Sequence, residues 1–171
     1  LFLFNHTLFI DHSNLLSAVL LVGILGLVDD MVGVNPFIKI VTLVTVYMFL
    51  YSAGFLITNL GVFLGVSLNL NFTLSILFTI LAIVAFTNAF NLIDGLDGLS
   101  GLIAIIIFLS FLVIGIKNND QFLITIPILF ITSLVVFIFY NWYPAKVFLG
   151  DSGSLMIGFT ISLMAVRSLS Y

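Results

Sequence analysis

Acidic residues are scarce in this sequence, and their type and spacing are unusual. All seven are aspartates, and no glutamate is present. Five of the seven fall in three short polar clusters between apolar stretches: Asp29-Asp30, Asn88 to Asp97 and Tyr140 to Ser154. Aspartate holds its carboxylate on a short side chain, which suits fixed ligand positions, and carboxylates within strongly apolar segments are typically functional. The three clusters are therefore the candidate chemistry of this protein.

The first cluster, Asp29-Asp30, closes an apolar stretch. Two adjacent carboxylates repel each other unless they share a cation, a proton or a basic partner. For a pair taken alone, the favoured interpretation is a polar stop at a helix end, made easier by Gly33 and Pro36. Lys39 follows at the start of the next apolar stretch, where an interfacial anchor is the simplest interpretation. Taken alone, this cluster does not require a function.

The second cluster is harder to explain without a ligand. Its polar residues, Asn88, Asn91, Asp94 and Asp97, recur at every third position, and each aspartate is followed by a glycine. While a helix lasts, the first three form one polar stripe on an otherwise apolar segment. Amide and carboxylate groups together suit a nucleotide base, a sugar or a hydrated metal ion. A simple turn needs one aspartate as a cap and neither asparagine, so the spacing favours a binding site.

The third cluster ends in Asp151-Ser152-Gly153-Ser154. This pattern predicts a helix N-cap in which Asp and Ser oxygens accept the free amides of the first turn. Such a cap leaves the other carboxylate oxygen of Asp151 available to a metal ion. The aromatic residues of the cluster suit an interfacial belt, with stacking on a base as the alternative for any one of them; they are Tyr140, Trp142, Tyr143 and Phe148.

The composition indicates the environment in which these clusters must work. Hydrophobic residues make up 63% of the 171 residues and charged residues 6%, against roughly 45–50% and about 25% in soluble domains. Lipid is the expected solvent, which excludes soluble enzymes. Four Lys and Arg residues are too few for a nucleic-acid surface. The absence of cysteine excludes thiolate catalysis and Cys-based metal sites.

Long apolar runs predict an all-α, polytopic membrane protein, with residues 1–171 forming a single transmembrane catalytic domain. The runs are continuous and lack the alternating pattern of a membrane β-barrel. The glycines and asparagines of Asn59 to Asn71 predict a short β-hairpin or ordered loop. The six expected spans are Ser13 to Val28, Phe37 to Ile57, Thr73 to Ile93, Leu99 to Ile116, Phe122 to Tyr140 and Ser154 to Leu169.

Alternating directions of consecutive spans bring the three clusters to one face of the membrane. The Asn59 to Asn71 segment and the connector Lys117 to Asp120 fall on the opposite, non-catalytic face. The basic residues do not decide which face is cytoplasmic, because two lean toward each face.

The order and spacing of the clusters closely resemble the bacterial polyprenyl-phosphate N-acetylhexosamine-1-phosphate transferases, a branch of glycosyltransferase family 4. The family's Asp-Asp pair corresponds to Asp29-Asp30, with the Lys39 region following. The motif Asn-x-x-Asn-x-x-Asp-Gly-x-Asp-Gly-Leu corresponds to Asn88 to Leu99, and Phe-x-Gly-Asp-x-Gly-Ser to Phe148 to Ser154. The wording of the last two motifs is more similar to the branch that uses UDP-N-acetylglucosamine than to the branch that uses UDP-N-acetylmuramoyl-pentapeptide.

The resemblance implies transfer of a sugar-1-phosphate from a UDP-amino sugar to undecaprenyl phosphate, which releases UMP and starts a cell-envelope glycan such as peptidoglycan or lipopolysaccharide. It implies Mg²⁺, or Mn²⁺ in its place, held by Asp151. Asp29 and Asp30 would serve the lipid phosphate as catalytic residues beside Asp151. Substrate-binding roles fall to a larger set: Lys39, Asn88, Asn91, Asp94, Asp97, and, near the uracil, Asn141 and Phe148.

The same resemblance implies a multi-pass protein of the bacterial cytoplasmic membrane with its active site on the cytoplasmic face, and no nucleic-acid partner. A His-rich loop and a basic amino-terminal segment, both usual in the family, do not occur in this sequence, so we expect a piece that is incomplete at both ends. Some relatives have a third aspartate in the first motif where Gly33 stands. The exact sugar, the downstream polymer, the division of labour between Asp29 and Asp30, and whether the protein forms a homodimer stay open.

Two other classes also place aspartates in membranes. An ion-coupled transporter would hold carboxylates near the mid-plane on broken helices, whereas these clusters lie at the ends of the spans. An intramembrane aspartyl protease is suggested by Leu149 to Asp151, but the sequence lacks the second, Tyr-Asp motif of that class.

Overall fold

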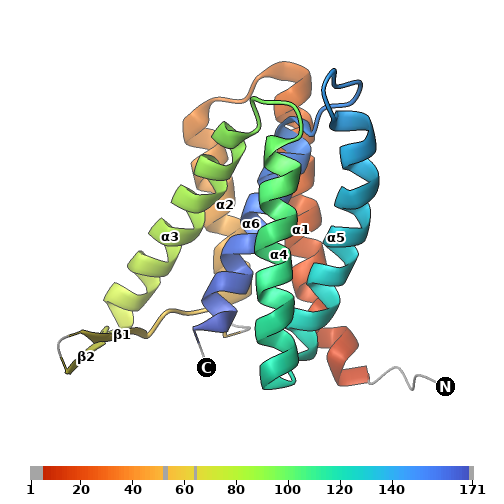
Figure 1. Cartoon of the computed structure of the whole chain (residues 1–171). Coiled ribbons are helices and arrows are strands. Elements are labelled where there is room, and N and C mark those ends of the chain that lie inside the picture. The colour runs from red at the N-terminus through yellow and green to blue at the C-terminus, as the bar shows by residue number, and fades with distance from the viewer. Residues whose placement is uncertain (1–5, 52–53, 64, 170–171) are drawn as a thin grey trace.

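The computed structural model describes residues 6–51, 54–63 and 65–169 and consists of six helices and one small sheet (Figure 1). The predicted all-α architecture with a short hairpin is confirmed. The helices are α1 (His6–Val32), α2 (Pro36–Tyr51), α3 (Phe72–Ile93), α4 (Leu99–Asn118), α5 (Gln121–Asn141) and α6 (Gly150–Ser168). The strands are β1 (Asn59–Phe63) and β2 (Val66–Asn69).

Four helices, α1, α3, α4 and α5, contain stretches long and apolar enough to cross a membrane, and α2 is a shorter apolar helix. Large apolar side chains on their outer faces, among them Leu81, Ile106 and Val136, are exposed. Apolar outer surfaces combined with backbone hydrogen bonds satisfied within each helix are what a bilayer requires. The protein is therefore built to lie in a membrane.

Helix α2 is shorter than the sequence predicted. The expected span ran from Phe37 to Ile57, but the helix ends at Tyr51. Phe55 and Ile57 are buried in the described, non-helical segment that begins at Gly54. There the Tyr47 hydroxyl donates to the carbonyl of Phe55 at 3.0 Å and the Ile57 amide donates to Thr79 Oγ1 at 3.0 Å. Side chains from α2 and α3 thus replace helical hydrogen bonds, which hydropathy alone does not reveal.

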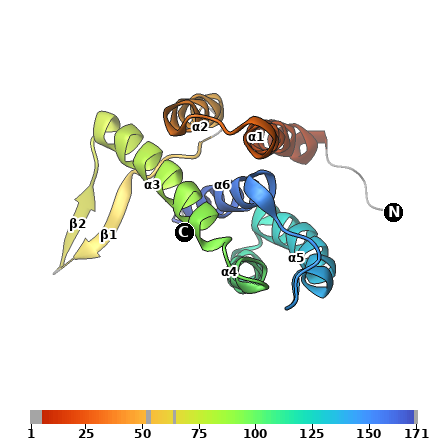
Figure 2. The same cartoon turned by 90° about the horizontal axis from the view of Figure 1, so that it is seen from above.

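Helix α6 is the centre of the bundle. It packs against α1, α3 and α4 (Figure 2). The helix begins at Gly150, four residues before the predicted start at Ser154, and most of its length is buried. Its own sequence is not among the stretches apolar enough to span a membrane. Neighbouring helices cover its polar residues, of which Ser154, Thr160 and Ser162 are buried.

The packing of α1 on α6 depends on a glycine. A Cβ atom at Gly26 would lie 2.4 Å from the carbonyl oxygen of Asp151 and 2.4 Å from the Cα of Ser152. Any side chain there would push the two helices apart, since real Cβ atoms never approach backbone so closely. Gly26 therefore sets how closely the end of α1 meets the start of α6.

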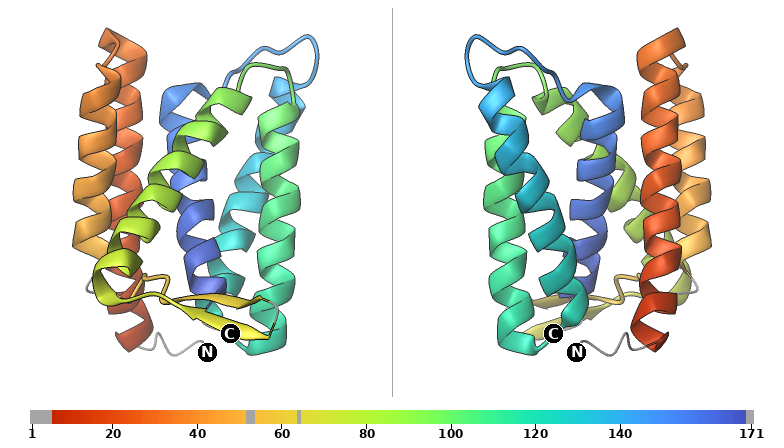
Figure 3. Two further views of the ribbon diagram at one scale, coloured as in Figure 1. Left: turned by 90° about the vertical axis from the view of Figure 1, so that its left-hand side faces the viewer. Right: turned by 90° about the vertical axis from the view of Figure 1, so that its right-hand side faces the viewer.

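The predicted convergence of the polar clusters is confirmed. Helices α1, α3 and α5 end at the same end of the bundle at which α2, α4 and α6 begin (Figures 1 and 3). The antiparallel hairpin lies at the opposite end, with Asn59 paired with Asn69 and Val62 with Ser67 (Figure 3). Residues far apart in the sequence thus share one polar end, the candidate site.

Candidate active site

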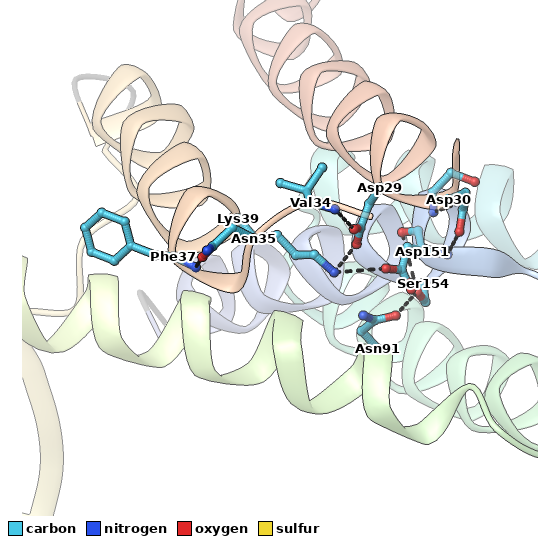
Figure 4. A network of polar contacts seen from close by, with 10 residues as sticks. Asp29, Asp30, Val34, Asn35, Phe37, Lys39, Asn91, Asp151 and Ser154 are labelled. Carbon is cyan, nitrogen blue, oxygen red and sulfur yellow. Dashed lines mark hydrogen bonds and ion pairs between the residues drawn. The ribbon is translucent and has the colours of Figure 1, made fainter. Parts of the chain in front are cut away.

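The centre of the polar end is a charged bridge made by three helices. The Lys39 ammonium of α2 contacts Asp29 Oδ2 of α1 and lies 3.0 Å from Asp151 Oδ2 of α6 (Figure 4). The side chain of Asp29 is 4% exposed, that of Lys39 16% and that of Asp151 32%. The bridge therefore runs from a buried carboxylate to a partly open one.

The connection between α1 and α2 holds Lys39 in reach of this bridge. The amide of Val34 donates to Asp29 Oδ1 at 2.6 Å, and the side chain of Asn35 accepts the amide of Phe37 at 2.8 Å at the start of α2. An asparagine oxygen in this position satisfies a first-turn amide that has no helical partner. The turn is thereby folded against Asp29, and the second helix starts with Lys39 facing the first.

Asp30 points to a different partner from its neighbour. Its Oδ1 accepts the amide of Asp151 at 2.8 Å, and its Oδ2 accepts the amide of Ser152 at 3.0 Å (Figure 4). The carboxylate therefore caps the amino-terminus of α6, where the free amides and the helix dipole favour a negative charge.

This arrangement corrects the predicted cap of α6. Asp151 and the serines after it were expected to cap their own helix, but the residue before the helix, Leu149, makes no side-chain cap, and Asp151 lies inside the first turn. The cap comes from α1 instead. Gly150 has a φ of +65°, and a Cβ there would lie 2.9 Å from Asp30 Oδ2, so glycine leaves room for the carboxylate.

The asparagine pair of α3 is divided between two environments. Asn91 Oδ1 accepts the hydroxyl of Ser154 at 2.5 Å, which links α3 to α6 one turn below Asp151 (Figure 4). Asn88 lies one turn before Asn91 in α3, and its side-chain amide donates to the carbonyl of Val84 in the same helix at 2.8 Å. The helix ends at Ile93, so that the predicted polar stripe covers both asparagines and Asp94 comes directly after it.

The aspartates of the second cluster brace the loops at this end. Asp94 Oδ1 accepts the hydroxyl of Ser100 at 2.6 Å, which fixes the turn between α3 and α4. Asp97 Oδ2 accepts the amide of Ala145 at 3.0 Å and so joins that turn to the connection between α5 and α6. The two loops over the polar end form one hydrogen-bonded unit.

Asn141 and Phe148, the two residues expected near a uracil, lie in contrasting places. Asn141 is 3% exposed. Its oxygen accepts the amide of Gly98 at 2.8 Å and its amide donates to the carbonyl of Val147 at 2.8 Å, so the side chain braces the loop. Phe148, in the loop between α5 and α6, is 70% exposed, and Trp142 and Tyr143 of the same connection are also exposed.

The electrostatics of the site are unbalanced. Asp29, Asp30 and Asp151 lie together with one ammonium, that of Lys39. Asp151 lies before the apolar part of α6. The neighbouring carboxyl of Asp29 and partial burial raise the pKa of Asp151, although Lys39 acts in the opposite direction. Carboxylates that share a site hold on to a proton or a cation for this reason.

The donor set fits one kind of metal site. In residues 6–51, 54–63 and 65–169, no three His, Cys, Asp or Glu side chains are grouped to hold a metal ion. Mg²⁺ needs no such cage, because it is commonly bound by one or two carboxylates together with waters and substrate phosphates. Asp151, the more open of the two carboxylates beside the Lys39 ammonium, supplies one. Its environment therefore fits a magnesium ion shared with a phosphate-bearing substrate.

Sequence reasoning missed two residues that shape the site. Ser154 holds Asn91 beside α6, and Gly26 lets α1 approach α6. Ser154 belongs to the third cluster, so its buried position could be suspected once α6 was placed in the centre. Gly23 and Gly26 are three residues apart and do not match the four-residue spacing of small residues at close helix contacts, so no sequence signal marks Gly26 among the 13 glycines.

Comparison with known proteins agrees with this geometry. The sequence model of glycosyl transferase family 4 matches residues 13–169. A probable undecaprenyl-phosphate N-acetylglucosaminyl 1-phosphate transferase of Bacillus subtilis is 33% identical over 147 residues, 85% of this chain and 41% of the relative. Phospho-N-acetylmuramoyl-pentapeptide-transferases of Staphylococcus haemolyticus and Streptococcus thermophilus are 33% and 30% identical, over 95% and 90% of this chain and 57% and 48% of the relatives.

The chain spans about half the length of these curated relatives. In this chain, the match to the family model covers all six helices, apart from the first turns of α1, and all three polar clusters. The chain belongs to glycosyl transferase family 4.

Proposed function

We propose that this protein transfers N-acetylglucosamine-1-phosphate from UDP-N-acetylglucosamine to undecaprenyl phosphate, with release of UMP. The observation that carries the proposal is the bridge of Asp29, Lys39 and Asp151 at one end of an apolar bundle. A site at the end of membrane helices can receive a lipid phosphate from the bilayer and a nucleotide sugar from water. Its position at helix ends supports a transferase over a transporter, whose carboxylates lie near the mid-plane.

The reaction exchanges one phosphoric anhydride for another. An oxygen of the lipid phosphate attacks the sugar-bearing phosphorus of the donor, and the bond from that phosphorus to the bridging oxygen breaks. UMP leaves with the bridging oxygen, and the product is a lipid diphosphate sugar. If the attacking phosphate carries a proton, a carboxylate of the site accepts it. Positioning and charge stabilisation are what such a transfer requires of a protein.

Each site residue has a role that suits its environment. Asp151, the more open carboxylate of the bridge, would hold Mg²⁺ or Mn²⁺ with the donor diphosphate. The metal would neutralise the charge on the phosphates during transfer. Asp29, buried at 4% side-chain exposure, would serve the lipid phosphate through Lys39, whose ammonium it holds in the site. Asp30 would act by holding the amino-terminus of α6, and with it Asp151, in place.

The donor nucleotide would bind over the second cluster. Asn88, Asn91, Asp94 and Asp97 offer amide and carboxylate groups from the end of α3 and the loop after it, and Asn141 braces that loop. Exposed aromatic rings stack well on bases, so Phe148 would face the uracil. We place this end at the cytoplasmic face of the bacterial membrane, because UDP-sugars are made in the cytoplasm.

The identity of the sugar on the donor is the most specific part of the proposal. The relatives include enzymes named for N-acetylglucosamine and for N-acetylmuramoyl-pentapeptide at the same 33% identity. The wording Asn88-Ala-Phe-Asn91 and Phe148 to Ser154 supports the first branch. A glycan of the cell wall or of lipopolysaccharide would be built on the product.

The proposal is tested with membranes that carry the full-length protein. Labelled UDP-N-acetylglucosamine and undecaprenyl phosphate are supplied with and without Mg²⁺, and lipid-linked label and UMP are measured. Magnesium-dependent formation of both in equal amounts is the expected result. The pentapeptide donor serves as the competing substrate in parallel. The absence of product from every UDP-amino sugar, with the protein inserted in the membrane, would refute the transferase function.

A further inference from the structure

Lys39 occupies the place between two carboxylates that a metal ion would need. Its ammonium contacts Asp29 Oδ2 and lies 3.0 Å from Asp151 Oδ2. Asp29 Oδ1 is already bonded to the amide of Val34, and both oxygens of Asp30 are bonded to amides of α6. The carboxylate oxygens that face one another are therefore those that Lys39 joins.

A cation in this position is an electrostatic requirement. Two carboxylates that share a site cannot both stay ionised without a positive charge between them. Lys39 supplies that charge from within the chain, so that the site is stable without any bound ion. A divalent ion on the same oxygens would meet the ammonium at close range, and two cations repel each other strongly where water is partly excluded.

We propose that Lys39 is a resident counter-cation that competes with the divalent metal for Asp151, so that metal binds tightly only together with a phosphate-bearing ligand. The inference rests on the proposed function for the nature of the metal and of the phosphate. A phosphate offers Lys39 another anion, which frees Asp151 for the metal. Metal and nucleotide then favour each other's binding, and coupling of this kind is reciprocal.

The unequal burial of the bridge indicates which contact exchanges. Asp29 is nearly inaccessible, whereas the side chain of Asp151 is about one-third exposed at 32% and that of Lys39 is 16% exposed. The Lys39 ammonium sits on a flexible four-carbon stem that can turn without moving the helix. The contact with Asp151 opens first, and the contact with Asp29 keeps the ammonium nearby.

The first test measures binding of Mn²⁺ alone to the purified full-length protein, by the electron paramagnetic resonance signal of the free ion. Lys39→Met removes the competing charge and leaves two carboxylates without a partner. We expect Mn²⁺ to bind roughly tenfold or more tightly than to the parent protein, within the range of such couplings. The gain should vanish in the double variant Lys39→Met, Asp151→Asn.

Lys146→Met is the matched control. Lys146 lies at the same end of the bundle and is exposed. Its removal changes the net charge by the same amount, so a general effect of charge would tighten Mn²⁺ equally in both variants. Equal tightening, or an unchanged affinity in Lys39→Met, would overturn the proposal. Lys39→Arg, which keeps the cation, should bind Mn²⁺ as weakly as the parent protein does.

The second test uses the parent protein, so that it does not depend on the folding of a variant. Acylation of each lysine by acetic anhydride is followed by mass spectrometry with and without Mg²⁺ and UMP. Mg²⁺ at a saturating level should speed acylation of Lys39 several-fold relative to Lys146, because it displaces the amine from Asp151. Addition of UMP together with Mg²⁺ should slow the acylation of Lys39 again, because the phosphate then holds the ammonium. A rate of Lys39 acylation that does not change with Mg²⁺ would refute the proposed competition.

These results separate the inference from the proposed function. Tighter Mn²⁺ binding in Lys39→Met together with no transfer from any UDP-sugar would leave the competition intact and refute the transferase. Transfer in the parent protein together with unchanged Mn²⁺ binding in Lys39→Met would refute the competition alone.

Discussion

Each end of the bundle holds a buried aspartate paired with a basic residue of another helix, yet the two pairs differ in charge balance. At the end that bears the hairpin, Arg167 Nε of α6 lies 2.8 Å from Asp120 Oδ2, and Asp120 Oδ1 accepts the amides of Phe122 and Leu123 at the start of α5. Among the described contacts of this pair, one carboxylate meets one guanidinium and one helix end. The pair ties α5 to α6.

At the opposite end, Asp29 and Asp151 share the single ammonium of Lys39, and Asp30 lies next to them. Three carboxylates lie beside one ammonium, so a further cation would be stabilised at this site. The comparison teaches that a buried ion pair does not by itself indicate a function. An excess of negative charge that hydrogen bonds hold in place is a better indication of a functional site.

The strongest test of this difference removes Asp151 from the unbalanced end. Asp151→Asn keeps the size and the helix but removes the charge that would hold the metal. We expect transfer to fall on the order of a thousandfold or more, with membrane insertion and the thermal midpoint close to those of the parent protein. The transfer assay and a thermal unfolding curve in detergent measure both. Normal activity would remove Asp151 from the proposed metal site.

A second test perturbs the packing that aligns the unbalanced end. Gly26→Leu places a side chain where even a Cβ would lie 2.4 Å from the Asp151 carbonyl oxygen. Overpacking of this kind costs about 1–3 kcal/mol of stability, and the displaced α6 should also lose activity. Gly23→Leu is the control on the same helix, because the nearest atom there is the sulfur of the flexible Met156. Equal effects of both variants would contradict the special role of Gly26.

The balanced end should respond in stability and not in catalysis. Asp120→Asn keeps an oxygen to cap α5 but removes the charge that pairs with Arg167. Because the side chain of Arg167 is 47% exposed, water compensates part of the loss, and we expect about 1 kcal/mol of destabilisation. Thermal unfolding measures the loss, and the transfer assay per folded molecule should be unchanged. A large loss of activity would mean that both ends serve catalysis.

The smallest perturbation tests whether the two ends face opposite sides of the membrane. The chain has no cysteine, so single cysteines report cleanly. Leu96→Cys and Tyr143→Cys at the unbalanced end should react with an impermeant thiol reagent from one side, and Asn118→Cys from the other. Stability and activity should not change. Labelling of all three from the same side would contradict the arrangement of the helices in the bilayer.

Much of the site could be predicted because parity of the spans is independent of packing detail. The apolar runs indicate the order and alternating directions of the helices, and this alternation brings Asp29, Asn91 and Asp151 to one end whatever the angles between helices. The partners of each carboxylate could not be predicted in this way. Asp29 and Asp30 are adjacent in sequence but point in directions about 100° apart on a helix, so one meets Lys39 and the other meets α6.

The predicted cap of α6 failed for a related reason. Capping rules describe residues close in sequence, and Asp151 with the serines after it satisfies them. The actual cap, Asp30, is 121 residues from the first amide that it accepts. Only the close packing at Gly26 brings it there. The overlong second span has a similar origin, because Tyr47 and Thr79 supply hydrogen bonds to an apolar segment that is not a helix.

The central position of α6 has a consequence for how the protein is made. The helix that carries Asp151 is not apolar enough to be among the spanning stretches, and it is shielded from lipid by helices made before it, α1, α3 and α4. It comes last in the described chain, so it leaves the ribosome when those neighbours are already in the bilayer. We expect its integration to depend on them, which makes placement of the Asp151 carboxylate a late and cooperative event in biogenesis.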